Sequence, residues 1–319
     1  MLKTEPTVLK SILAVNLNVN IWSARRKLQP GDFVHSELPP EKLASLGSKR
    51  VCDPGELRIF GTLKARAVSL LDKSGVRFLG GWGIPEKKAA DIVKGLEAIA
   101  EEFKLAKDRF MDRYDIAIQN WIKDNPGWEK IIATSVVSAD YVAKRIAFNW
   151  QVFKVLNPTG RRKKLLETGL QSEVGNLGGT LFDEIARTAK EAFTKSFLGK
   201  SMITRKALSP LKGIQQKLFD LSFIEPRVAP VASLIQSALD KIPGRGAISG
   251  TTLLMLNGLL TLLNNTGALT NYAQEIIDGR SNDSVLDALV KPDKPKKKAK
   301  SKAESPVQNG SRLESLGLW

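Results

Sequence analysis

The sequence predicts a mostly α-helical protein that has a long helical arm, a helical bundle, a small N-terminal α/β portion and a disordered basic C-terminal tail. Three patterns carry this prediction. Apolar residues recur at spacings of three and four over about four heptads after Pro85. Near the N-terminus, apolar and polar residues alternate strictly. After Pro292, Pro, Lys, Ser and Ala dominate without apolar periodicity. These patterns divide the chain into the N-terminal α/β portion (1–84), the long helical arm (85–160), the helical bundle (161–290) and the basic tail (291–319).

Residues 8–22 alternate as expected for a strand with one buried face. One face carries Leu13, Val15, Leu17, Val19 and Ile21, and the other carries Asn16, Asn18 and Asn20. The asparagine side chains either form a solvated face of the sheet or contact a neighbouring strand or a ligand. Asp53 and Pro54 then predict the start of a helix that continues to about Leu71. Residues 76–79 predict a second strand, which leaves through a glycine turn at 80–83 and pairs with the first.

The longest pattern predicts a single helix from 85 to about 123, roughly 60 Å long at about 1.5 Å per residue. Asp124, Asn125, Pro126 and Gly127 end it. A seam of this length needs a partner, which is either a helix returning in the same chain or a second subunit of a homo-oligomer.

The rest of the chain predicts further helices. A short helix follows at 128–132, and another, capped by Ser138, at roughly 139–155. Glycines divide 164–198 into two helices with a kink or short loop near Gly178, and the next helix ends at about 221. Others lie near 228–241, 250–264 and 267–278.

A single histidine, His35, and a single cysteine, Cys52, limit the chemistry that the chain can perform. They exclude a Cys/His zinc site within one chain, and only His35 could serve a Ser-His-Asp triad. The composition therefore favours a binding protein without metal or cofactor over an enzyme. The enzymatic alternative would use carboxylates and a borrowed metal.

The net charge is +16. Eight basic and three acidic residues between 291 and 319 account for only part of this excess, so the folded body is also basic. This excess of positive charge favours binding to a polyanion, either nucleic acid or an acidic protein. A role in solubility alone would also explain the charge.

Candidate nucleic-acid contacts fall in three basic stretches. The first follows Trp22, the second follows the break at Asn157, Pro158, Thr159 and Gly160, and the third lies in the tail. A charge run can equally be a solvated face. The candidates are Arg25, Arg26, Lys27, Arg161, Arg162, Lys163, Lys164, Lys296, Lys297 and Lys298.

The tail ends in apolar residues, which suggest a tethered docking motif. Leu316, Leu318 and Trp319 are the candidate docking residues, and a frayed terminus is the alternative. No apolar run reaches the roughly 18 residues that span a membrane. The N-terminus lacks a signal-peptide pattern, so a cytoplasmic location is expected.

Four sequence segments resemble those of a known family: residues 17–28, 44–50, 76–81 and 178–182. Together they resemble an uncharacterised bacterial family with a domain of unknown function, over roughly 8–265. The resemblance implies an origin in phages, plasmids or integrative conjugative elements. It also implies, as partners, a MoxR-like AAA+ ATPase and a von Willebrand A-type protein that are often encoded nearby. No catalytic residue carries over.

The leading functional hypothesis is a non-enzymatic adaptor that works with the AAA+ ATPase. The alternative is a DNA- or RNA-binding protein of a mobile element that has little sequence preference.

Overall fold

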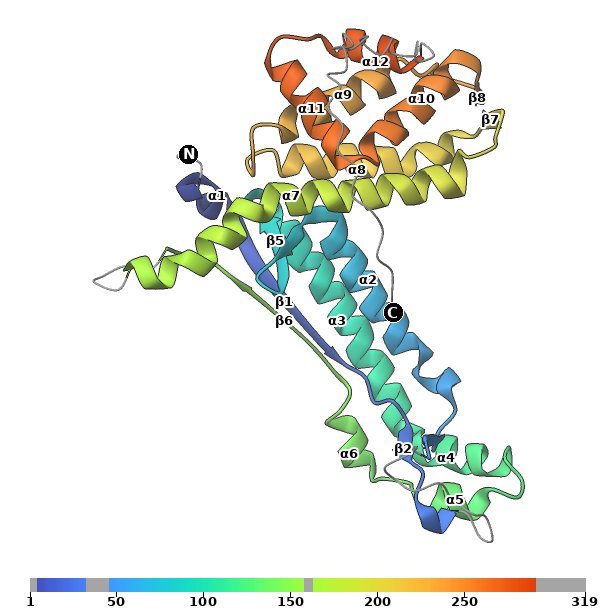
Figure 1. The fold of residues 1–319 in the computed structure, drawn as a ribbon. Helices are drawn as coiled ribbons and strands as arrows, with labels where there is room; N and C mark the ends of the chain where they lie inside the picture. The colour runs from blue at the N-terminus through green and yellow to red at the C-terminus, as the bar shows by residue number, and fades with distance from the viewer. Residues whose placement is uncertain (1–4, 33–45, 158–162, 291–319) are drawn as a thin grey trace, which may run out of the picture.

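The computed structural model describes residues 5–32, 46–157 and 163–290 of the chain. The molecule is elongated, with a group of helices at one end of a long stalk (Figure 1). We call residues 163–290 the head. The stalk comprises 12–20, 54–112 and 147–153. The tip, at the far end of the stalk, comprises the described residues of 21–53 together with 113–146.

The helices of the stalk and tip are α1 (Glu5–Ser11), α2 (Pro54–Ser74), α3 (Ala89–Asp112), α4 (Tyr114–Lys123), α5 (Glu129–Ala133) and α6 (Ala139–Ala143). Those of the head are α7 (Lys163–Ser196), α8 (Ser209–Asp220), α9 (Val228–Asp240), α10 (Gly250–Leu263), α11 (Thr266–Ile277) and α12 (Asn282–Val290). The strands are β1 (Ile12–Asn20), β2 (Arg25–Lys27), β3 (Ser48–Arg50), β4 (Val76–Phe78), β5 (Gly81–Pro85), β6 (Ala147–Phe153), β7 (Met202–Ile203) and β8 (Ile248–Ser249).

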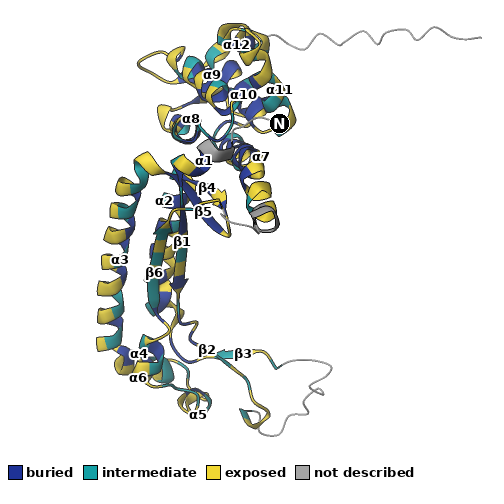
Figure 2. Cartoon of the chain, turned by 90° about the vertical axis from the view of Figure 1, so that its left-hand side faces the viewer, coloured by how far each residue is buried: buried dark blue, intermediate teal, exposed yellow. Residues whose placement is uncertain are grey.

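The main sheet has the strand order β4-β5-β1-β6, and its neighbouring strands are antiparallel. Strand β5 pairs only with Ile12–Val15 of β1, whereas β6 pairs with β1 from Ala14 to Asn20. Towards the tip, the sheet therefore narrows to two strands. Helix α3 lies along one side of these strands (Figure 2).

Two hydrophobic cores stabilise the molecule. The stalk core joins one face of the sheet to α2 and α3 through side chains such as Phe60, Leu63 and Phe103. The head core lies among α7–α12 and extends to the near end of β1 through Ile12 and Ala14. The predicted portions 1–84 and 85–160 share one core and one sheet, because β6 pairs with β1.

The predicted N-terminal strand is present as β1, but residues 8–11 belong to helix α1. The second strand does not pair with β1 as predicted, because the expected glycine turn is itself strand β5 and lies between them. Its glycines permit this close packing. A Cβ at Gly81 would lie 2.2 Å from the backbone oxygen of Val15.

The predicted helix 85–123 is interrupted at Arg113, and α4 turns away at the foot of α3 (Figure 1). The apolar seam of α3 packs within the chain. Ile92, Leu96 and Phe103 are buried in the stalk core with α2, so in this structure the returning helix of the same chain supplies the partner.

The prediction of a helix over 139–155 is wrong beyond Ala143, because residues 147–153 form strand β6. Phe148, Trp150 and Val152 alternate with polar residues, which is the signature of a strand. Pairing with β1, more than a hundred residues away, decides the outcome over local helical spacing.

The predicted break near Gly178 is also wrong, because α7 is continuous across it. Gly178 instead makes room for the Glu225 side chain, whose Oε2 would lie 2.1 Å from an added Cβ. The later helices appear where expected as α9, α10 and α11, and α12 was not predicted. Within the described residues, no helix combines the length and the apolar character needed to cross a bilayer.

Candidate nucleic-acid interface

Trp22 anchors the point at which the chain leaves β1 and enters the tip. Its side chain is only 5% exposed, and its ring centroid lies 5.9 Å from that of Tyr114 and 6.5 Å from that of Phe110. Ala24 adopts a positive φ of 52°, which turns the chain into β2. Buried aromatic packing thus determines where Arg25 and Arg26 emerge.

Strands β2 and β3 form a two-stranded ribbon that places positive charges opposite one another. Arg25 lies opposite Arg50, and Arg26 lies opposite Lys49. Like charges in such positions destabilise a ribbon. Lys49 is neutralised by Asp32, whose Oδ1 lies 2.5 Å from its Nζ. A hydrogen bond from the backbone N–H of Gln29, together with the one from Lys49, lowers the pKa of Asp32.

A second segment of the tip brings three more functional side chains to the same place. The Tyr114 hydroxyl donates to the Val137 oxygen at 2.7 Å and so ties down the start of α6. Ser138 caps this helix, its Oγ accepting from the Tyr141 backbone N–H at 3.3 Å. Helix α6 and the turn after it carry Tyr141, Lys144 and Arg145.

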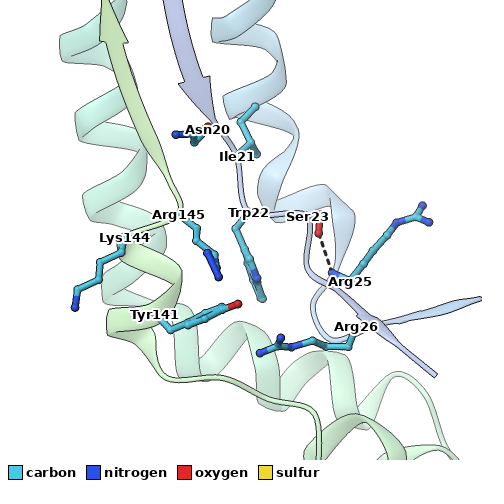
Figure 3. A pocket seen from close by; sticks show the side chains of 9 residues that line it. All are labelled: Asn20, Ile21, Trp22, Ser23, Arg25, Arg26, Tyr141, Lys144 and Arg145. Atoms are coloured by element: carbon cyan, nitrogen blue, oxygen red, sulfur yellow. Dashed lines mark hydrogen bonds between the residues drawn. The ribbon is translucent and has the colours of Figure 1, made fainter. Parts of the chain in front are cut away.

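The two segments enclose a pocket of about 460 Å³ (Figure 3). The guanidinium carbon of Arg145 lies 4.0 Å from the centroid of the Tyr141 ring, and that of Arg26 lies 5.2 Å from it. Arg25 and Lys144 extend outward at the rim. The lining residues are Asn20, Ile21, Trp22, Ser23, Arg25, Arg26, Tyr141, Lys144 and Arg145.

The pocket is strongly electropositive. It contains four cationic side chains, and none of its lining residues is acidic. Among the described residues, none of these four cations forms an ion pair. Unpaired guanidinium groups beside an aromatic ring can hold phosphate through bidentate hydrogen bonds while offering flat surfaces to a base.

The single cysteine, Cys52, does not supply a nucleophile to this pocket. Cys52 is fully buried, and desolvation raises the pKa of its thiol to about 11, with the nearby carboxylates of Glu56 and Asp53 acting in the same direction. A thiol with so high a pKa is protonated near neutral pH and reacts poorly. Among the described residues, no three His, Cys, Asp or Glu side chains gather closely enough to hold a metal ion.

Of the predicted contacts, Arg25 and Arg26 line the pocket, whereas Lys27 lies farther along the β2–β3 ribbon. Lys163 and Lys164 begin α7, beyond the opposite end of β6 from the pocket, and their side chains are not described. Several other predicted residues lie outside the described part of the chain: Arg161, Arg162, Lys296, Lys297, Lys298, Leu316, Leu318, Trp319 and His35.

The sequence did not predict that Tyr141, Lys144 and Arg145 lie beside Arg26. These three residues fall within five positions of one another, inside the predicted helix 139–155. Only the antiparallel pairing of β1 with β6 puts this cluster next to the end of β1, because Asn20 lies opposite Ala147.

Comparison with known proteins gives one match. A family model described as a protein of unknown function (DUF3150) matches residues 9–265. No curated protein and no solved structure matches the chain. The matched region includes β1, the stalk and tip elements and most of the head. Because it spans well over half of the sequence, the chain belongs to the DUF3150 family.

Proposed function

We propose that this protein binds nucleic acid and grips the phosphate backbone at the tip of its stalk. The observation that carries the proposal is the pocket in which Arg26 and Arg145 flank Tyr141 without any acidic lining residue. Lys144 and Arg25 add positive charge at the rim, and the β2–β3 ribbon extends that charge along the surface.

The combination of guanidinium groups and an aromatic ring in the pocket favours nucleic acid over an acidic protein as the ligand. A carboxylate-rich surface would be attracted by charge alone, and lysines would suffice for it. Guanidinium groups stacked on an aromatic ring also suit planar bases and bidentate phosphate contacts. The tip's contribution should have little sequence preference, since backbone contacts carry no base information.

The test is fluorescence anisotropy with labelled oligonucleotides over a series of salt concentrations. The variant Arg26→Gln/Arg145→Gln should bind at least tenfold more weakly, with a shallower salt dependence, because two phosphate contacts are lost. The control Arg187→Gln/Lys190→Gln removes the same charge from exposed positions of α7 in the head. Equal losses of oligonucleotide affinity in both variants would show that binding depends on net charge alone, and would refute a binding site at the tip.

The contribution of the lysine-rich tail is separated by a chain that ends at Val290. On the proposal, this shortened chain still binds, and the Arg26→Gln/Arg145→Gln substitutions still weaken it. Binding that disappears with residues 291–319 would place the nucleic-acid contacts on Lys296, Lys297 and Lys298, outside the folded body.

The second candidate function is an adaptor for an AAA+ ATPase, and the head offers one observation in its favour. Phe219 on α8 is 65% exposed and borders two adjoining hollows of about 650 and 410 Å³. An exposed aromatic at the edge of a groove suits a protein partner. The MoxR-like AAA+ ATPase and the von Willebrand A-type protein are the partners that the family resemblance implies.

Co-purification with a MoxR-like ATPase tests the adaptor role. Phe219→Ser should abolish capture and leave oligonucleotide binding unchanged, because Phe219 lies in the head and the phosphate pocket lies at the tip. No capture by the unaltered chain would eliminate this candidate. The two functions are compatible, since they use opposite ends of one molecule.

A further inference from the structure

Beyond Ala14, towards the tip, one face of the stalk's sheet is covered by no helix of the described residues. Along β1, Val15 and Val19 are buried in the stalk core with α2 and α3. The alternate residues Asn16, Asn18 and Asn20 are all exposed. Because successive side chains of a strand point to opposite faces, these three asparagines share the uncovered face.

Strand β6 extends this face with matching residues. Gln151 lies opposite Asn16, and Asn149 lies opposite Asn18. Directly opposed residues of an antiparallel pair project from the same face. Both are exposed, so five amide side chains form a ladder on a two-stranded surface. Asparagine is disfavoured in strands, so this composition brings no gain in folding stability.

The amide ladder connects two features that suit a nucleic-acid strand. At one end, Asn20 lines the phosphate pocket beside Arg26 and Arg145. At the other end, Phe153 projects from the same face as Gln151, since it lies two residues farther along β6, and it is 45% exposed. The face therefore runs from a cationic pocket, over uncharged hydrogen-bonding groups, to an exposed aromatic ring.

We propose that this face is a track for an unpaired nucleic-acid strand that leaves the pocket and runs along the stalk towards Phe153. The inference rests on the proposed function, because the pocket supplies the charge that holds the strand. Amide groups can donate to and accept from the edges of unpaired bases. Phe153 offers a stacking surface to one base, as aromatic residues do in proteins that bind single strands.

A duplex fits this track poorly. Its Watson–Crick edges are paired and its bases are stacked on one another, so these edges cannot reach the amide ladder, and no base can stack on the Phe153 ring, unless the duplex opens. A duplex can still place one phosphate backbone against the cationic tip. The structure therefore assigns to this face a preference for single strands over duplexes, with DNA and RNA sharing the same contacts.

The test compares oligo(dT), oligo(rU) and a duplex of matched length on the full chain. Asn18→Thr/Asn149→Thr removes two amides from the track while raising strand propensity, so the fold is preserved. It should weaken single-strand binding about tenfold, because two hydrogen bonds are lost, and leave duplex binding unchanged. The matched variant Asn18→Gln/Asn149→Gln keeps the amides and should retain most of the affinity.

Phe153→Ala should weaken single-strand binding at least fivefold, whereas Phe153→Tyr, which keeps an aromatic ring, should not. Because DNA and RNA share the contacts of the track, oligo(dT) and oligo(rU) should bind with similar affinities, and binding of only one of them would contradict the proposal. If the unaltered chain binds but the Thr variant and Phe153→Ala behave like it, the track is refuted and the tip site stands. Failure of the unaltered chain to bind any probe overturns the proposed function itself.

Discussion

The ammonium group of Lys217 in α8 lies 2.7 Å from the Glu184 carboxylate in α7 (Nζ to Oε2), and this largely buried pair of the head also contacts the stalk. The same Nζ donates to the Asp72 oxygen at the end of α2, also at 2.7 Å. Glu184 accepts in addition from the backbone N–H of Arg77 in β4. Two head helices and two stalk elements thus share one charged network, which sets the direction of the stalk relative to the head.

The first prediction concerns this junction. Lys217→Met leaves the Glu184 carboxylate, whose side chain is only 13% exposed, without its cationic partner and should lower the free energy of unfolding by about 3–5 kcal/mol. The double variant Lys217→Met/Glu184→Leu removes both charges and should recover much of that loss. Urea denaturation followed by circular dichroism measures both. A single variant as stable as the parent would show that the pair does not hold the junction.

The second prediction concerns glycines that, from the sequence, were expected to form a turn at 80–83 or to divide the helix near Gly178. Gly81→Ala should destabilise the chain by about 1–3 kcal/mol, since the added Cβ meets the Val15 backbone oxygen and must push β5 from β1. Gly175→Ala is the matched control, because its Cβ meets nothing within 4 Å in the middle of α7. There the same change should stabilise by about 0.5–1 kcal/mol. Two changes of the same sign would contradict this packing.

The third prediction links a helix cap to binding. Ser138→Ala removes the side-chain acceptor of the Tyr141 N–H and should cost about 1 kcal/mol of local stability. Because α6 carries Tyr141, its fraying should weaken oligonucleotide binding severalfold while the urea midpoint changes little. Ser138→Asp restores a cap acceptor and should restore binding in part. Unchanged affinity in Ser138→Ala would mean that α6 does not need this cap to present its side chains.

The fourth prediction concerns alkaline pH. Burial raises the pKa of Cys52 from 9.0 to about 11 and that of Tyr114 from 10.0 to about 12. The folded state thus retains protons that the unfolded chain releases at lower pH. The contribution of these two groups to stability should be constant below about pH 9 and should fall as pH rises towards 12. For Cys52 alone, the loss between pH 9 and 11 is on the order of 2 kcal/mol.

Cys52→Ala isolates the thiol's share of this pH dependence. The variant should lose the decline between pH 9 and 11 and keep the later decline that Tyr114 causes. Urea midpoints measured over pH 7–12 provide the comparison, with the slope rather than the absolute stability as the readout. Parallel curves for both proteins would show that the thiol does not titrate as its burial requires.

Local signals in the sequence were reliable where one element's own residues decide its structure. The alternation in β1, the Asp53 and Ser138 caps and the seam of α3 were all readable, because they depend on strand or helix periodicity and on nearby backbone groups. Candidates Arg25 and Arg26 could be named for the same reason, since a basic run beside Trp22 is a local feature.

The sequence by itself determined the helical class, the basic character and the positions of most elements in this protein. Only the tertiary structure decided that 147–153 is a strand, that Gly81–Pro85 lies inside the sheet and that Arg26 meets Arg145 across Tyr141. These outcomes depend on pairing between residues more than sixty positions apart. The free energy of such pairing comes from contacts that exist only after the chain has folded, and local propensity does not encode it.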